Sequence, residues 1–180
     1  MHLDLMRDED KIFPAVAQPD AVRSLRIWHC SYRTLDGIGN LRNLQTLVIA
    51  TFPDATLSAL SSLSQLRYLR ILHMPRVTDL SPLMALSALE CLSLETLPSW
   101  DSSGKTTEVD SLDPIGHLHE LCYLALFGVR PKDRSLAAIE RCQRLQSARF
   151  SKYPKSEVAR FYQVRRVSNA HVPEPEYETG

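Results

Sequence analysis

The sequence predicts an α/β solenoid, a right-handed coil with a curved parallel sheet on its concave face and short helical or 3-10 returns on its convex face. Three observations predict it. Leucine fills 27 of the 180 positions, more than a typical globular domain contains. An apolar frame with spacings of three and then two residues recurs six times, and an apolar triplet at three-residue spacing, such as Leu57/Leu60/Leu63, follows each of the first five copies.

The frame recurs at a nearly constant interval. Its first positions are separated by 22, 22, 23, 32 and 24 residues, so the unit has 22 residues and one insertion at about 98–110. Alternation by two is typical of a strand, and spacing by three is typical of a helical return. The six copies are Val22/Leu25/Ile27, Leu44/Leu47/Ile49, Leu66/Leu69/Ile71, Leu89/Leu92/Leu94, Leu121/Leu124/Leu126 and Leu145/Ala148/Phe150.

These repeats resemble those of a known family. Over 22–152 the chain resembles a leucine-rich-repeat protein, and 77–94 closely resembles the 22-residue repeat of bacterial internalins. The resemblance implies a solenoid that binds protein. The chain departs from the family three residues after the last strand leucine, where family members usually have Asn. An apolar spine is expected there instead, formed by Cys30, Phe52, Met74, Leu97 and Val129.

The chain is expected to form one domain with a cap at each end, because an open solenoid exposes core at both ends. Residues 1–21 form the N-terminal cap and 22–152 the six repeats. Residues 153–166 form a C-terminal capping helix with Ser156 as its N-cap, and 167–180 form an extended tail rich in proline and acids. The side chains expected to cover the first coil are Leu3, Leu5, Ile12, Phe13 and Val16.

Charge and cysteine usage exclude several classes of protein. Lys+Arg and Asp+Glu both number 21, so the whole chain lacks the basic excess of a nucleic-acid-binding protein. The longest apolar runs are far shorter than the ~20 residues that span a bilayer, and the charged first ten residues are unlike a secretory signal. A cytoplasmic chain without membrane contact is therefore expected. The four cysteines have no zinc-type spacing and are interpreted as reduced thiols, without metal or cofactor.

The concave face holds the candidate functional residues. Side chains between and just after the strand leucines point away from the core, because successive strand residues face opposite sides of a sheet. Four fixed cations face one acid there, and aromatic side chains of the kind that dominate binding hot spots lie among them. The candidate partner-binding residues are Arg26, Trp28, His29, Tyr68, Arg70, Leu72, His73, Glu95, Trp100, Tyr123, Phe127, Arg149 and Lys152.

This face predicts a non-enzymatic module that binds a protein partner with an acidic contact surface. No pair of carboxylates and no Ser/His/Asp set converges in the repeats, so no catalytic residue is predicted. For a small bacterial protein of this kind, the resemblance implies an immunity protein or other inhibitor, an adaptor, or a delivered effector. The oligomeric state is left open.

Two alternatives remain open. The chain could be a weak scaffold or structural module with an inert surface, in which the insertion folds across the sheet and buries Trp28, Leu72 and Phe127. It could also bind single-stranded nucleic acid, although four cations make a small electrostatic footprint. Trp100 in the insertion is either an anchor at the rim or packs back onto the sheet.

Overall fold

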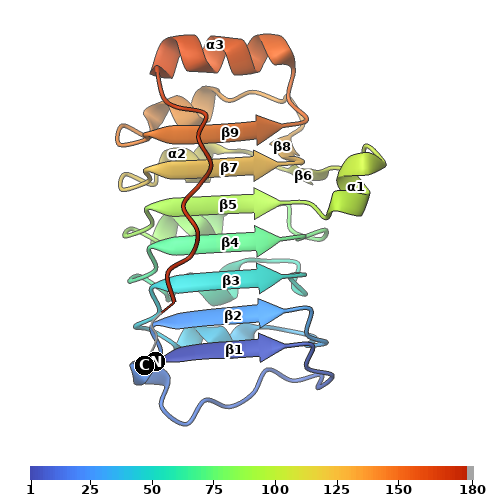
Figure 1. Cartoon of the computed structure of the whole chain (residues 1–180), viewed down its shortest axis with the longest axis vertical. Coiled ribbons are helices and arrows are strands. Elements are labelled where there is room, and N and C mark those ends of the chain that lie inside the picture. Colours follow the sequence, from blue (N-terminus) through green and yellow to red (C-terminus); the bar gives the residue numbers. More distant parts are fainter. Residues whose placement is uncertain (178–180) are drawn as a thin grey trace.

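The computed structural model describes residues 1–177 and shows one long parallel sheet (Figure 1). In the described residues this sheet has seven strands, in the order β1-β2-β3-β4-β5-β7-β9. Two further strands, β6 (Thr107–Val109) and β8 (Val129–Pro131), pair with each other beside it. The seven strands are β1 (His2–Met6), β2 (Ser24–Trp28), β3 (Thr46–Ala50), β4 (Tyr68–Leu72), β5 (Cys91–Glu95), β7 (Tyr123–Phe127) and β9 (Ser147–Ser151).

The register of the sheet follows the repeat. Leu25 of β2 lies opposite Leu47 of β3, which lies opposite Leu69 of β4. The same alignment continues through Leu92 and Leu124 on β5 and β7. These side chains are buried between the sheet and the returns. The predicted fold class, a leucine-rich-repeat solenoid, is therefore confirmed.

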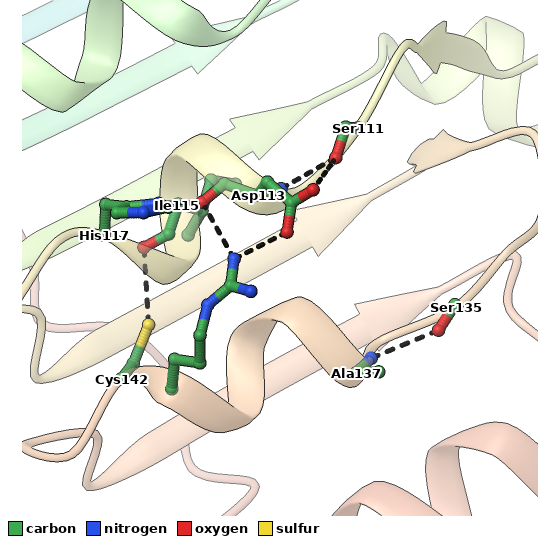
Figure 2. Close-up of polar contacts among 8 residues, drawn as sticks. Ser111, Asp113, Ile115, His117, Ser135, Ala137 and Cys142 are labelled. Carbon is green, nitrogen blue, oxygen red and sulfur yellow. Dashed lines mark hydrogen bonds and ion pairs between the residues drawn. The ribbon is translucent and has the colours of Figure 1, made fainter.

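The returns lie behind the sheet in Figure 1. They are short because a 22-residue unit leaves room for only one or two turns between strands. Hydroxyls just before several returns accept a backbone N–H, as Ser111 Oγ does from Asp113 at 2.9 Å (Figure 2). The returns are η1 (Pro19–Ala21), η2 (Asp36–Asn40), η3 (Ser58–Leu60), η4 (Ser81–Ala85), α2 (Asp113–Gly116) and η5 (Ala137–Arg141).

Polar contacts join α2 to η5 on the convex side. The guanidinium of Arg141 donates to the Asp113 carboxylate, and the thiol of Cys142 donates to the carbonyl oxygen of Ile115 at 3.4 Å (Figure 2). A Cβ on Gly116 would lie 2.4 Å from the carbonyl oxygen of Ala138. A glycine is thus required where the two returns approach most closely.

The predicted apolar spine is present in three of its five positions. Phe52, Met74 and Val129 are fully buried, whereas Cys30 and Leu97 are half-buried. Leu97 directly precedes the insertion, where the chain leaves the regular coil. Apolar packing thus takes the place of the usual Asn at Phe52, Met74 and Val129.

The N-terminal segment adds a strand that the sequence analysis did not predict. β1 pairs with β2, and its Leu3 and Leu5 pack against the core as expected. Phe13 is also buried, with its ring 5.7 Å from that of Tyr32. The expectation for Ile12 was wrong, because this side chain is 80% exposed. Only one of two adjacent loop residues can turn inward, and Phe13 takes that place.

A helix covers the other end of the sheet. α3 (Lys155–Arg165) buries Phe161 completely, with its ring 5.1 Å from that of Phe150 on β9. The N-cap prediction was wrong, since Pro154 occupies that position and Ser156 lies inside the first turn. The Glu157 carboxylate instead accepts the backbone N–H of Leu136. The helix is thus tied to the preceding return.

The insertion and the tail occupy different places. α1 (Pro98–Ser102) of the insertion projects beyond the carboxyl end of β5 and does not lie over the sheet (Figure 1). The alternative in which the insertion covers the concave face was therefore wrong. The C-terminal segment crosses that face instead, in front of the strands (Figure 1). Among the described helices, none has the length and apolar character needed to cross a membrane.

Candidate functional site

The concave face consists of three rows of side chains, because each strand directs its first, third and fifth residues away from the core. The first row is His2, Ser24, Thr46, Tyr68, Cys91, Tyr123 and Ser147. The middle row is Asp4, Arg26, Val48, Arg70, Ser93, Ala125 and Arg149. The last row is Met6, Trp28, Ala50, Leu72, Glu95, Phe127 and Ser151.

The tail, residues 167–177, begins with hydrogen bonds to the last strand. The backbone N–H of Ala148 donates to the Ser168 carbonyl, and the N–H of Ser168 donates to the Gln146 carbonyl, both at 2.9 Å. The hydroxyl of Ser147 donates to the carbonyl of Ala170 at 2.7 Å. These bonds fix the direction in which the tail leaves β9.

The rest of the tail lies over the first row. Val172 and Tyr177 pack against an apolar cluster formed by Val48, Tyr68 and Cys91. Trp28 and Tyr123 pack against the same cluster from the sheet. The tail therefore joins side chains from several strands into a small second core on the concave side.

Tyr177 reaches the N-terminal end of the sheet. Its ring centroid lies 4.5 Å from that of His2 on β1. The guanidinium carbon of Arg26 lies 6.0 Å from the Tyr177 ring centroid, at the outer limit of a cation–π contact. The tail thus spans the sheet from β9 to β1.

This cover buries residues that the sequence analysis expected on an open surface. Tyr68 is 9% exposed and Cys91 is 5% exposed. Burial raises the pKa of the Cys91 thiol to about 12, so at neutral pH the group is a protonated thiol and a poor nucleophile. Tyr68 can contact a partner only if the tail moves away, whereas Tyr123 is half-buried beside the tail.

The arginines of the middle row form ion pairs within the concave face. Arg70 donates two hydrogen bonds to Glu95, at 2.8 and 3.2 Å, and the hydroxyl of Ser93 donates to the same carboxylate. Arg26 pairs likewise with Asp4, and this hydrogen bond lowers the pKa of the Asp4 carboxyl. Asp4 was missed because 1–21 was not expected to contain a strand. The face is therefore less basic than predicted.

Arg149 completes the charged part of the face. Its guanidinium carbon lies 5.6 Å from the ring centroid of Phe127. The same group donates to the imidazole of His171 in the tail. Arg149 therefore connects the last row to the beginning of the tail.

The last row remains partly open to solvent. Trp28, Leu72 and Phe127 are half-buried, whereas Ala50 between two of them is buried. The backbone beneath these side chains belongs to a regular parallel sheet. This row is the apolar part of the concave face that the tail leaves most accessible.

Three predicted contact residues lie in turns after the strands. His29, His73 and Lys152 have φ of 54°, 70° and 65°, in the left-handed region that few non-glycine residues adopt. His29 is exposed and Lys152 half-buried. The expectation that His73 contributes to an open surface was wrong, since it is 8% exposed beneath Trp100, with ring centroids 4.7 Å apart. Trp100 thus packs back toward the sheet.

Metal binding finds no support in the described residues. Within 1–177, no three His, Cys, Asp or Glu side chains are placed to hold a metal ion. The four cysteines are all free thiols: Cys30, Cys91, Cys122 and Cys142.

The position of the tail was not predicted. The sequence predicted an extended tail at 167–180, of which 178–180 lie outside the described residues, but not that 172–177 lie over the sheet. One signal was available, since Glu174 and Glu176 are acidic while the concave face was predicted to be basic. Val172 and Tyr177, the anchors of the tail, have no apolar periodicity that would distinguish them from linker residues.

Comparison with known proteins identifies the fold. No protein-family model and no curated protein matches the chain. An internalin (InlF) from Listeria monocytogenes is 18% identical with a TM-score of 0.51, over 86% of this chain and 50% of that one. The functional domain of InlJ from the same species is 16% identical with a TM-score of 0.52, over 74% of this chain and 27% of that one.

A third structure, internalin C2 from Listeria monocytogenes, is 19% identical with a TM-score of 0.49, over 72% of this chain and 62% of that one. This chain therefore spans less than two thirds of each of these three internalins. The resemblance to internalin repeats, predicted from the sequence, is confirmed at the level of the fold.

Proposed function

We propose that this chain is a non-enzymatic module that binds one protein partner on its concave face. The observation that carries the proposal is the last row, where Trp28, Leu72 and Phe127 remain half-exposed. Parallel sheets are usually covered on both faces. A partly open apolar row on such a sheet is therefore a site at which a second protein can complete the cover.

The charged residues beside this row favour a partner with an acidic contact surface. Arg26, Arg70 and Arg149 border the apolar side chains and are already hydrogen-bonded within the chain. A partner carboxylate has to share or replace these contacts, so charge would set orientation and association rate more than affinity. The preformed sheet loses little conformational entropy on binding, which favours a stable complex.

The biological role we propose is that of a cytoplasmic inhibitor, such as an immunity protein, or an adaptor. The observation favouring a reducing compartment is that all four cysteines are free thiols. A rigid face that holds one partner suits either role.

Affinity purification from the native host tests this proposal. The wild type is compared with a Leu72→Ala, Phe127→Ala double variant and with Met84→Ala, a control that removes an exposed apolar side chain from η4. We expect one protein to be retained by the wild type and the control and lost by the double variant. Cooperative thermal melting of all three chains checks that each is folded. Equal retention by all three chains overturns the concave site, and no specific protein on any of them favours the inert structural module.

A further inference from the structure

We propose that the first row is a groove for an extended acidic segment of the partner, and that residues 172–177 of the chain occupy this groove until the partner displaces them. The inference rests on the proposed function, because it defines the partner chemistry of the same face. Figure 1 shows the tail running across the strands over their amino-terminal halves.

The contact between residues 172–177 and the sheet can be replaced by another segment. The tail crosses the strands and does not run alongside them, so it cannot extend the sheet by a ladder of backbone hydrogen bonds. Within the described residues, the backbone groups of the tail that form hydrogen bonds with β9 and the residue before it belong to Ser168 and Ala170. Residues 172–177, as the structure describes them, form no backbone hydrogen bond with the sheet. In the part of the chain that the structure describes, side-chain contacts hold 172–177, and they can be exchanged for those of another segment.

The occupied groove shows which chemistry it accepts. Val172, Pro175 and Tyr177 are half-buried, whereas the glutamates between them are exposed. Burial lowers the pKa of Arg70, but the hydrogen bond and ion pair with Glu95 raise it overall, and the nearby Glu174 adds a smaller increase. The Tyr177 ring lies beside Arg26. A matching segment therefore carries apolar or aromatic anchors separated by acids, in an extended, proline-containing chain.

The tail leaves room for a larger occupant. A groove of about 460 Å³ remains between the tail and the sheet. Arg23, which precedes β2, Tyr123 of β7 and the Arg67–Glu90 ion pair line one side of it, and Glu174 and Glu176 line it from the tail. Cores are packed much more tightly than this. A partner segment with longer side chains can therefore gain contacts that the tail does not make.

Because the tail is tethered to the groove, its effective concentration determines how strongly it competes with a partner segment. A segment tied to its site by a short linker has an effective concentration on the order of 1 mM. If the free segment binds the open groove with a Kd of about 100 μM, the tethered tail occupies it roughly ten to one and weakens a competitor about tenfold. Displacement is thus within reach of an ordinary protein partner.

A peptide in trans tests the inference on the full-length chain. The probe is a fluorescein-labelled peptide of residues 169–177, with a scrambled peptide of the same composition as its control. Binding is measured by anisotropy on the wild type and on a Val172→Asp, Tyr177→Ala variant, which removes both anchors of the tail. We expect the variant to bind the probe about tenfold more tightly than the wild type, and the scrambled peptide to bind neither.

Two further variants locate the probe. Adding Tyr68→Ala to the anchor variant should abolish probe binding, whereas adding Arg42→Ala, at an exposed position before β3, should leave it unchanged. No probe binding to the anchor variant, or equal binding to wild type and variant, overturns the inference. A wild-type dimer that the anchor variant abolishes also overturns it, because the occupant is then a second copy. Each of these outcomes leaves the host purification with Leu72→Ala, Phe127→Ala to decide the proposed function separately.

Discussion

The first and last rows of the concave face belong to the same strands yet differ in environment. They lie about 13 Å apart along each strand, at ~3.3 Å per residue. The tail buries Tyr68 in the first row, whereas Leu72 on the same strand remains half-exposed in the last. The repeat alone cannot make this difference, because it places both side chains on the same face. A non-repeating segment decides which part of the sheet is available.

The largest expected effect comes from truncating, on β4, one side chain in the first row and one in the last row. Tyr68→Ala removes a buried aromatic ring and should lower the free energy of unfolding by about 3 kcal/mol. Leu72→Ala removes a half-exposed side chain and should cost about 1 kcal/mol. Urea denaturation of the two variants measures both values. Equal losses would show that the tail does not cover the first row in solution.

The cost of Tyr68→Ala should also depend on the tail. In the Val172→Asp, Tyr177→Ala background the ring is already exposed on its outer side, so truncating it should cost at least 1 kcal/mol less than in the wild type, since residues in contact couple. Leu72→Ala should cost the same in both backgrounds. An additive result for Tyr68 would contradict a direct contact between the tail and this ring.

The next largest effect is expected at Arg70 in the middle row, which lies between the first and last rows. The side chains of Arg70 and Glu95 are 31% and 13% exposed, so this pair lies between the exposed and buried cases and Arg70→Ala should cost about 2 kcal/mol. The Arg26–Asp4 pair is more exposed, and Arg26→Ala serves as the matched control with a cost of about 1 kcal/mol or less. Equal costs would mean that the centre of the face is as hydrated as its edge.

A smaller effect, about tenfold in rate, is expected at Cys91. Iodoacetamide reacts with thiolates, and burial beneath the tail both shields this thiol and raises its pKa to about 12. The Val172→Asp, Tyr177→Ala variant should therefore be alkylated at Cys91 about tenfold faster, as followed by peptide mass spectrometry. Cys142 lies in the main core and serves as the internal control. Unchanged Cys91 reactivity would indicate that something other than the tail protects it.

Much of the fold could be predicted because the same apolar frame recurs in six units of the chain. Each leucine frame aligns with the next in register, so an error in one unit is corrected by its neighbours. β1 has no full copy of the frame, and only its contacts with β2 make it a strand. The position of the tail is harder to predict, because it depends on side chains of all seven strands of the large described sheet, which no local pattern connects. The candidate surface could thus be named from the sequence, but its cover could not.

The smallest expected effect concerns His73, which the insertion covers at the end of β4. Burial lowers the pKa of His73, so its protonation favours the unfolded state. Its contribution to stability is present above the unfolded pKa of about 6.5 and is lost as pH falls through the lower folded value. The wild type should therefore lose stability as the pH falls below about 6.5.

His29 provides the matched control for His73, because it occupies the same turn position after β2 but is exposed. Thermal melts between pH 5 and 7 should be flatter for His73→Asn than for the wild type, whereas His29→Asn should keep the wild-type slope. Trp100→Ala should also flatten the profile, since it hydrates the imidazole. If stability depends on pH as steeply in His73→Asn as in the wild type, the insertion does not cover this end of the last row. The accessible part of the last row would then extend toward α1.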